Sequence, residues 1–400
     1  MKYIHKMDET EKQVGVFLEL RKRLQSGHLV LSPDLAKSAS EVDVSCGPSC
    51  LQIKTPGSLV DVQLPVGVSV VADSCREVPG AARDGLHMRL QLNSDHVTEV
   101  VPSLIESLKA QKSYWFACQS CGESVLMERV FLRVLPLPGG NWNTLVDDWC
   151  CHPDPFANRK LLPRKEDCLL GDTFILLNWD CESSETMTKE PKTTDTLISQ
   201  DKDLKQKSKQ NDKVICKSCG ALLGEAISPD TLKLYITEVT VRLCEENENP
   251  SVHNRSLYVE NVIAARLVEL STTQSTFRFS VQDPSGKAYI LLWLLNTDTL
   301  LVSSMETSIC SSALISSQDS SCTEHKSQEA SSVIKVLYLP CLKSQHQDVI
   351  DAWEKNIGVH QIPLPRKTCH DVLEILSRST ATLPPSMRTM NAFQATFMKL

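Results

Sequence analysis

The spacing of apolar and polar residues changes several times along the chain. Residues 60–64 and 86–92 alternate between apolar and polar side chains, which is typical of half-buried strands. Residues 130–135 and 173–177 are rich in strand-forming residues as well. Between 259 and 270, apolar residues recur at helical spacing instead. Because strand and helix segments do not alternate regularly, the pattern predicts an α+β fold, rich in β-structure, rather than a doubly wound sheet.

The same pattern predicts several shorter elements. They are an amphipathic stretch at 17–24, helices at 141–149 and 349–353, a strand at 277–281, a helix beginning near Thr368, and a C-terminal helix around Phe393 and Phe397.

Two segments of biased composition suggest how the chain is organised. Residues 182–213 hold seven acidic and seven basic side chains and almost no large apolar ones, which favours a flexible linker. Residues 303–332 contain twelve serines and are expected to form a long loop. We therefore expect a β-rich N-terminal domain at 1–181 and an α+β C-terminal domain at 214–400 that carries the serine-rich loop.

Composition and charge narrow the class of partner and the cellular compartment. The 400 residues carry a formal net charge of −7, which weakens the case for a protein that binds nucleic acid or an anionic membrane. The longest strongly apolar run, 288–295, is much shorter than the roughly 20 residues that a bilayer span needs. The charged start does not resemble a signal peptide. We expect a cytoplasmic or nuclear protein whose 16 cysteines stay reduced.

Two short cysteine motifs form a near repeat. Cys118 and Cys121 are separated by two residues and are followed by glycine, and Cys216 and Cys219 repeat this arrangement. Two such turns can supply the four thiolates of a closed structural zinc site, which would join the two expected domains. Two unrelated pairs of buried thiols are the alternative. A redox motif is less favoured because no βαβ pattern surrounds either pair.

A third cysteine-rich stretch follows the expected helix at 141–149. Cys150, Cys151 and His152 precede two prolines, so a stiff loop would present side chains that bind metal ions well. Vicinal cysteines in an extended segment point in opposite directions, so both do not readily bind the same ion. The loop would then complete a metal site or offer a thiolate to a partner's metal. The alternative is a structural role, with one cysteine packed beneath the tryptophans.

Cys369 is the candidate for covalent chemistry. Thr368 and Asp371 resemble a capping box, which would put Cys369 in the first turn of a helix. The helix dipole contributes roughly 1 kcal/mol and leaves the thiol mostly protonated on its own, so a basic neighbour would have to help. In the alternative interpretation Cys369 belongs to the core. Cys341 is a second candidate.

Several longer strings resemble one family, the HECT-like ubiquitin ligases that bind a ubiquitin-conjugating enzyme. They lie at 118–123, 133–138, 149–158, 214–219 and 290–296, so the resemblance runs over nearly the whole chain. It implies a ubiquitin-protein transferase that accepts ubiquitin from a conjugating enzyme and passes it to substrate lysines.

The resemblance also assigns roles to particular residues. HECT ligases carry a Leu-Pro and Thr-Cys string, and Leu364, Pro365, Thr368 and Cys369 are the matching positions. Cys369 would carry ubiquitin as a thioester. Phe397 occupies the fourth position from the end, where HECT ligases commonly have phenylalanine. His370 and Asp371 differ from the usual Phe-Asn after the cysteine. The conjugating enzyme is expected to dock around 242–264.

Members of this family are also linked to the metal-dependent endonuclease that processes pre-mRNA 3′ ends. The loop at 150–155 resembles a tail motif in a protein that occupies the active site of a related nuclease. Cys151 or His152 would then bind the zinc ions of that endonuclease and block its active site. This implies an alternative, non-enzymatic function in which the protein inhibits or chaperones the endonuclease.

Overall fold

The computed structural model describes residues 15–79, 84–95, 107–137, 162–180, 183–191, 211–244, 254–303, 324–341 and 346–400. These residues are rich in β-structure, as predicted, and contain few helices. Its contacts divide it into two compact units. The first unit comprises 1–100, 292–339 and 374–400, and the second comprises 101–291 and 340–373. This division differs from the expected domains at 1–181 and 214–400, because strands distant in the sequence pair with one another.

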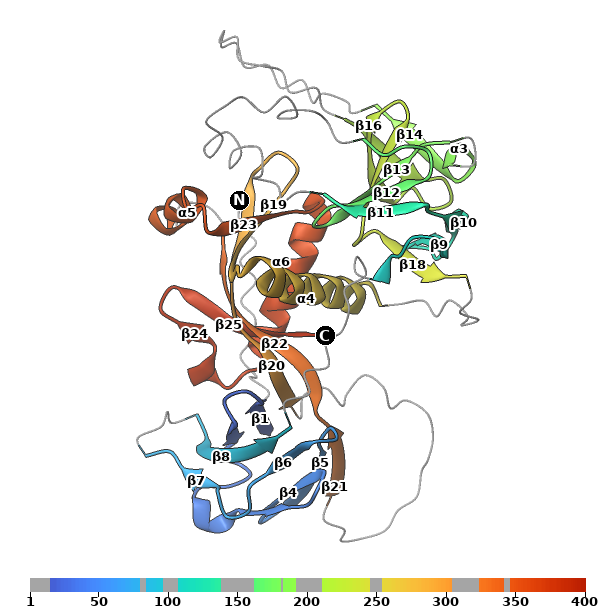
Figure 1. Ribbon diagram of the computed structural model, residues 1–400. Helices are drawn as coiled ribbons and strands as arrows, with labels where there is room; N and C mark the ends of the chain where they lie inside the picture. Colours follow the sequence, from blue (N-terminus) through green and yellow to red (C-terminus); the bar gives the residue numbers. More distant parts are fainter. Residues whose placement is uncertain are drawn as a thin grey trace. The chain divides into compact units, whose positions relative to one another are not determined.

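One sheet of the first unit combines strands from both ends of the chain. Its strand order is β24-β25-β22-β20-β1-β2-β8-β6, and β7 also pairs with β8. Figure 1 shows the blue N-terminal strands joining orange and red strands from the C-terminal part. The bounds are β1 (Val16–Arg21), β2 (Ser26–Leu31), β6 (Val68–Val70), β7 (Arg76–Glu77), β8 (Leu86–Ser94), β20 (Ala288–Ser303), β22 (Ser331–Pro340), β24 (Thr389–Met390) and β25 (Phe393–Lys399).

The sequence of β1 reflects its position inside this sheet. β1 pairs with both β2 and β20 in antiparallel fashion. Phe17 packs into one apolar cluster, whereas Leu18 and Leu20 pack into another, so both faces of the strand are covered. Glu19 is the exception, and its buried carboxylate accepts a hydrogen bond from Lys335 Nζ at 2.9 Å. A strand buried on both faces has a nearly continuous apolar sequence. Of the stretch expected to be amphipathic at 17–24, residues 17–21 therefore form such a strand, and the rest lies in the turn after it.

A second sheet of the first unit has the order β21-β5-β4-β3. Its strands are β3 (Asp43–Cys46), β4 (Cys50–Thr55), β5 (Ser58–Gln63) and β21 (Glu324–Glu329), and the 3-10 helices η1 (Ala39–Glu41) and η3 (Pro385–Met387) belong to the same unit. β21 runs parallel to β5 and lies within the expected loop at 303–332. The loop expectation is therefore wrong for 324–329, which pair with β5, and for 331–332, which begin β22. Serine-rich composition does not reveal these backbone partners.

The C-terminal helix expected around Phe393 and Phe397 is wrong. These residues lie in β25, which pairs with β22 in antiparallel register. A spacing of four residues fits one turn of a helix and also two alternate positions of a strand, so it does not distinguish the two. The expected strands at 60–64, 86–92 and 277–281 are confirmed by β5, β8 and β19 (Arg278–Gln282).

The second unit contains two further sheets, with orders β10-β9-β18 and β11-β12-β13-β17-β16-β15-β14. One apolar core is built from both sheets. Their strands are β9 (Ser113–Cys118), β10 (Ser124–Val130), β11 (Arg133–Pro136), β12 (Asp167–Leu170), β13 (Phe174–Asn178), β14 (Met187–Glu190), β15 (Asp212–Cys216), β16 (Leu222–Ser228), β17 (Thr231–Tyr235) and β18 (Val239–Leu243).

The described ends of the expected linker at 182–213 are ordered. α3 (Ser183–Thr186) and β14 fall within it, and β15 begins there. β14 pairs with β15 through the register Met187↔Cys216, and Met187 is buried in the core. The count of charged residues overlooked Met187, the apolar residue that anchors this edge of the sheet.

The longer helices of the second unit confirm the sequence pattern. α4 (Arg255–Gln274) covers the predicted helix at 259–270, and α5 (Gln347–Glu354) covers 349–353. α6 (Arg366–Ala381) begins in the second unit and continues into the first. β19 pairs with β23 (Val359–Pro363) in parallel. Among the described residues, no helix is both long and apolar enough to cross a bilayer.

Candidate functional site

The two cysteine motifs occupy equivalent turns of two β-hairpins. Cys118 ends β9, and the chain reverses before β10; Cys216 ends β15, and the chain reverses before β16. All four cysteines lie in the second unit. The expectation that the site joins the two domains is therefore corrected: it joins two hairpins of one unit.

Backbone hydrogen bonds give both turns the same shape. The Gly122 N–H donates to the Cys118 carbonyl and the Gly220 N–H to the Cys216 carbonyl, each at 2.8 Å. Both glycines have positive φ, 75° and 72°, a conformation that other residues adopt with strain. In each turn, two further backbone N–H groups donate to the sulfur of the first cysteine. The repeated glycine is thus explained by the turn that it permits.

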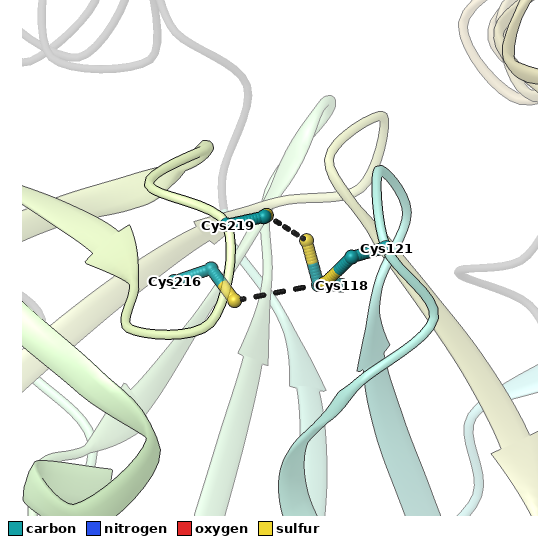
Figure 2. Close-up of side chains that lie close together, drawn as sticks. All are labelled: Cys118, Cys121, Cys216 and Cys219. Carbon is teal, nitrogen blue, oxygen red and sulfur yellow. Dashed lines mark hydrogen bonds between the residues drawn. The ribbon is translucent and has the colours of Figure 1, made fainter.

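The four sulfurs converge at a spacing that suits a tetrahedral metal ion. They all lie within 4.8 Å of one another. Figure 2 shows two of the pairs, Cys118–Cys219 at 3.7 Å and Cys121–Cys216 at 3.9 Å. Zinc–sulfur bonds of about 2.3 Å in tetrahedral geometry place the sulfurs about 3.8 Å apart. The residues present therefore fit a closed four-cysteine site, with no position left open for a reacting molecule.

The electrostatics of the cluster also suit a cation. Burial raises the pKa of the Cys118 thiol, and the neighbouring sulfurs of Cys216 and Cys219 raise it further. Burial likewise raises the pKa of Cys216. Four close sulfurs can all ionise only when a positive charge lies between them, because a metal ion compensates both their repulsion and their loss of hydration.

Cys369 lies in the first turn of α6, but the expected capping box is not formed. The helix begins at Arg366, and the Cys369 N–H already donates to the Pro365 carbonyl at 2.9 Å. The Thr368 hydroxyl donates to Glu238, and the Asp371 carboxylate accepts from Arg255. The capping interpretation was wrong because both side chains have partners distant in the sequence.

The thiol of Cys369 is fully buried, with 0 % of the residue exposed. Its sulfur donates to the carbonyls of Gln282 and Leu364, each at 3.6 Å. Burial raises the pKa of Cys369 to about 12, and the nearby Asp283 carboxylate also raises it. Burial therefore outweighs the helix dipole, and in this conformation Cys369 is a protonated, inaccessible thiol. Burial also raises the pKa of the second candidate, Cys341, to about 11.

The remaining predicted site residues are placed as follows. Cys150, Cys151 and His152 lie outside the described residues, so the proposed endonuclease loop stays a prediction. Phe397 is buried in the first unit.

One pair of charged residues was missed at the sequence level. Glu238 and Arg255 form an ion pair beside the first cysteine turn, with the carboxylate buried. A basic residue at the first position of a helix was the available signal, because the helix dipole disfavours it there.

Comparison with known proteins shows which family the chain resembles. Residues 19–395 match the model of the family described as HECT-like Ubiquitin-conjugating enzyme (E2)-binding.

The chain belongs to this family.

Its relatives include several proteins that are each named as an E3 ubiquitin-protein ligase. The protein from Mus musculus is 43% identical over 389 residues, which cover 97% of this chain and 98% of the relative. The protein from Homo sapiens is 41% identical over 396 residues, which cover 98% of this chain and 100% of the relative. No solved structure matches the chain. The family confirms the resemblance seen in the sequence and implies a ubiquitin-conjugating enzyme as a partner.

Proposed function

We propose that this protein is a ubiquitin ligase that binds a charged ubiquitin-conjugating enzyme and promotes transfer of ubiquitin to substrate lysines. The family match over residues 19–395 carries the proposal, because it names binding to the conjugating enzyme. Relatives that align over nearly their whole length and are named E3 ubiquitin-protein ligases support it. Ubiquitin and protein substrates are the further partners that this function requires.

The proposed chemical route passes through a thioester on Cys369. The Cys369 thiolate would attack the thioester carbonyl that joins ubiquitin to the conjugating enzyme, and the enzyme's cysteine would leave as a thiolate. A substrate lysine amine would then attack the new thioester and release Cys369. Because the thiol is buried and protonated in the described conformation, this route requires the first turn of α6 to separate from Gln282 and Leu364.

Non-reducing electrophoresis after incubation with the charged conjugating enzyme tests both statements. We expect a ubiquitin adduct that thiols reduce, that becomes a thiol-resistant ester in Cys369→Ser and that disappears in Cys369→Ala. Cys341→Ala is the matched control and should keep the adduct. Ubiquitin transfer that persists in Cys369→Ala would refute the thioester but leave the ligase. No increase in transfer over the conjugating enzyme alone would refute the ligase itself.

We also propose that the four-cysteine cluster holds one structural zinc ion. The sulfur spacing supports this, and the closed ligand set suits a structural rather than a catalytic ion. Elemental analysis of the purified chain should find about one zinc per molecule, lost in Cys118→Ser and in Cys216→Ser. Retention of the full metal content in both variants would contradict the proposed site.

A further inference from the structure

The buried carboxylate of Glu238 lies where three elements of the second unit meet. Its Oε1 accepts hydrogen bonds from the Thr368 hydroxyl at 2.5 Å and from Arg255 Nη2 at 3.0 Å. Its Oε2 accepts a hydrogen bond from Arg255 Nη1, also at 3.0 Å. Only 6% of Glu238 is exposed. Glu238 therefore connects the turn before β18, the start of α4 and the first turn of α6.

Arg255 extends the same network in two directions. Besides its bidentate pairing with Glu238, its Nε donates a hydrogen bond to Asp371 at 3.0 Å, and its Nη1 donates one to Gln119 Oε1 at 3.2 Å. Arg255 is the first residue of α4, where the helix dipole disfavours a cation. Two carboxylates offset that cost, so the side chain is held by its partners rather than by its own helix.

The network reaches the metal cluster through Gln119. This residue lies between Cys118 and Cys121 in the first cysteine turn. Its backbone N–H donates to the Glu238 carbonyl at 3.0 Å, and its side chain accepts from Arg255. Gln119 is itself buried. A change in the shape of this turn would therefore disturb both hydrogen bonds.

The other end of the network adjoins Cys369. Thr368 is fully buried, and its bond to Glu238 fixes the residue that directly precedes the cysteine. Asp371, two residues beyond the cysteine, is fixed by Arg255. We propose that the Glu238–Arg255 pair acts as a latch that holds the first turn of α6 against the end of β19, so that Cys369 stays buried, and that a metal ion in the cysteine cluster keeps this latch in place.

Removing Arg255 would leave the Glu238 carboxylate buried without a counter-charge, which strongly disfavours the closed arrangement. Removing the metal would release the first cysteine turn and with it Gln119. Either change would let α6 open locally at its first turn, where these interactions hold it. The coupling to the cysteine cluster rests on the proposed zinc ion, whose presence elemental analysis establishes separately. The proposed thioester matters only for the consequence in ubiquitin transfer, since access to the thiol can be measured directly.

The test is the rate at which iodoacetamide alkylates Cys369 in the folded full chain, followed by mass spectrometry of the peptide. We expect slow alkylation in the wild type and a rate at least about tenfold higher in Arg255→Ala, because local opening becomes easier. Arg255→Lys keeps one charge and should give an intermediate rate. Wild-type protein stripped of metal by a chelator should resemble Arg255→Ala, and metal bound again should restore slow alkylation.

Arg266→Ala is the matched control. Arg266 lies on the same helix α4 and pairs with Asp172 at 2.6 Å, but it is more buried than Arg255 and belongs to a different cluster of charges. Its loss should leave alkylation of Cys369 unchanged. Equal acceleration in Arg266→Ala would overturn the latch and show general loosening of the unit, as would unchanged alkylation in Arg255→Ala. Acceleration in Arg255→Ala without any effect of metal removal would overturn the coupling to the cysteine cluster.

Discussion

We expect Phe397→Ala to destabilise the first unit. Only 3% of this residue is exposed, and it packs in a cluster with Phe17 and Leu337. Its ring centroid lies 6.1 Å from that of Phe17, and Lys335 Nζ lies 5.3 Å from the ring centre. The surroundings are those of a core residue.

The size of the effect follows from this burial. The lost transfer free energy of the side chain is about 2 kcal/mol. The substitution empties about 100 Å³, which at about 24 cal/mol per Å³ costs about 2 kcal/mol more. The lost ring contact with Phe17 adds about 1 kcal/mol. The total of about 5 kcal/mol is at the upper end of measured Phe→Ala values in cores. Phe397→Leu keeps most of the volume and should cost about 1 kcal/mol.

Urea unfolding followed by circular dichroism measures the free energy of unfolding, and hydrogen exchange of β22 and β25 peptides assigns the loss to the first unit. Phe397→Leu is the control. It should lower the unfolding midpoint far less than Phe397→Ala and keep ubiquitin transfer near the wild-type value. A Phe397→Leu variant that is stable but inactive in transfer would refute the structural interpretation and assign the ring to the chemistry.

Three further predictions concern the metal, pH and the endonuclease. Removing zinc with a chelator should speed hydrogen exchange in β9 and β15, next to the cysteine turns, and leave β1 unchanged. Burial and the neighbouring His87 lower the pKa of His28 to about 4. Because the unfolded value is about 6.5, the unfolded chain binds the extra proton first, so the free energy of unfolding should fall by about 2 kcal/mol between pH 6.5 and 4. This fall should shrink in His28→Asn, as urea midpoints would show. Cys150→Ala and Cys151→Ala should weaken binding to the purified 3′-end-processing endonuclease without changing the urea midpoint, and undiminished affinity in both variants would contradict the predicted loop.

Local signals predicted the cysteine cluster well. Each turn depends on the spacing of its two cysteines and on the glycine that follows them. Both are short-range features, so the sequence of the turn alone is enough to predict them. The alternating strands β5 and β8 were predicted for a similar reason, because one face of each is more buried than the other. What the sequence did not reveal is that both cysteine turns lie in the same unit, since that depends on how distant strands pair.

Elements whose character depends on distant partners were harder to predict. Phe393 and Phe397 fit a helix as well as a strand until β24 and β22 supply the pairing partners. Thr368 and Asp371 resembled a capping box, but Glu238 and Arg255 compete for the same side chains. The burial of Cys369 likewise depends on contacts with Gln282 at the end of β19, so the sequence left its catalytic and core interpretations open.

The pairing of β1 with β20 has a consequence for synthesis of the protein on the ribosome. Leu20 and Leu300 are partners in this ladder, so about 280 residues must be added before β1 meets its neighbour. At roughly 5–20 residues per second, this takes about 15–60 s. Throughout that time the nearly continuous apolar segment β1 lacks the hydrogen bonds that it finally makes with β20. The nascent chain is therefore expected to recruit chaperones early, and slower translation should increase its aggregation.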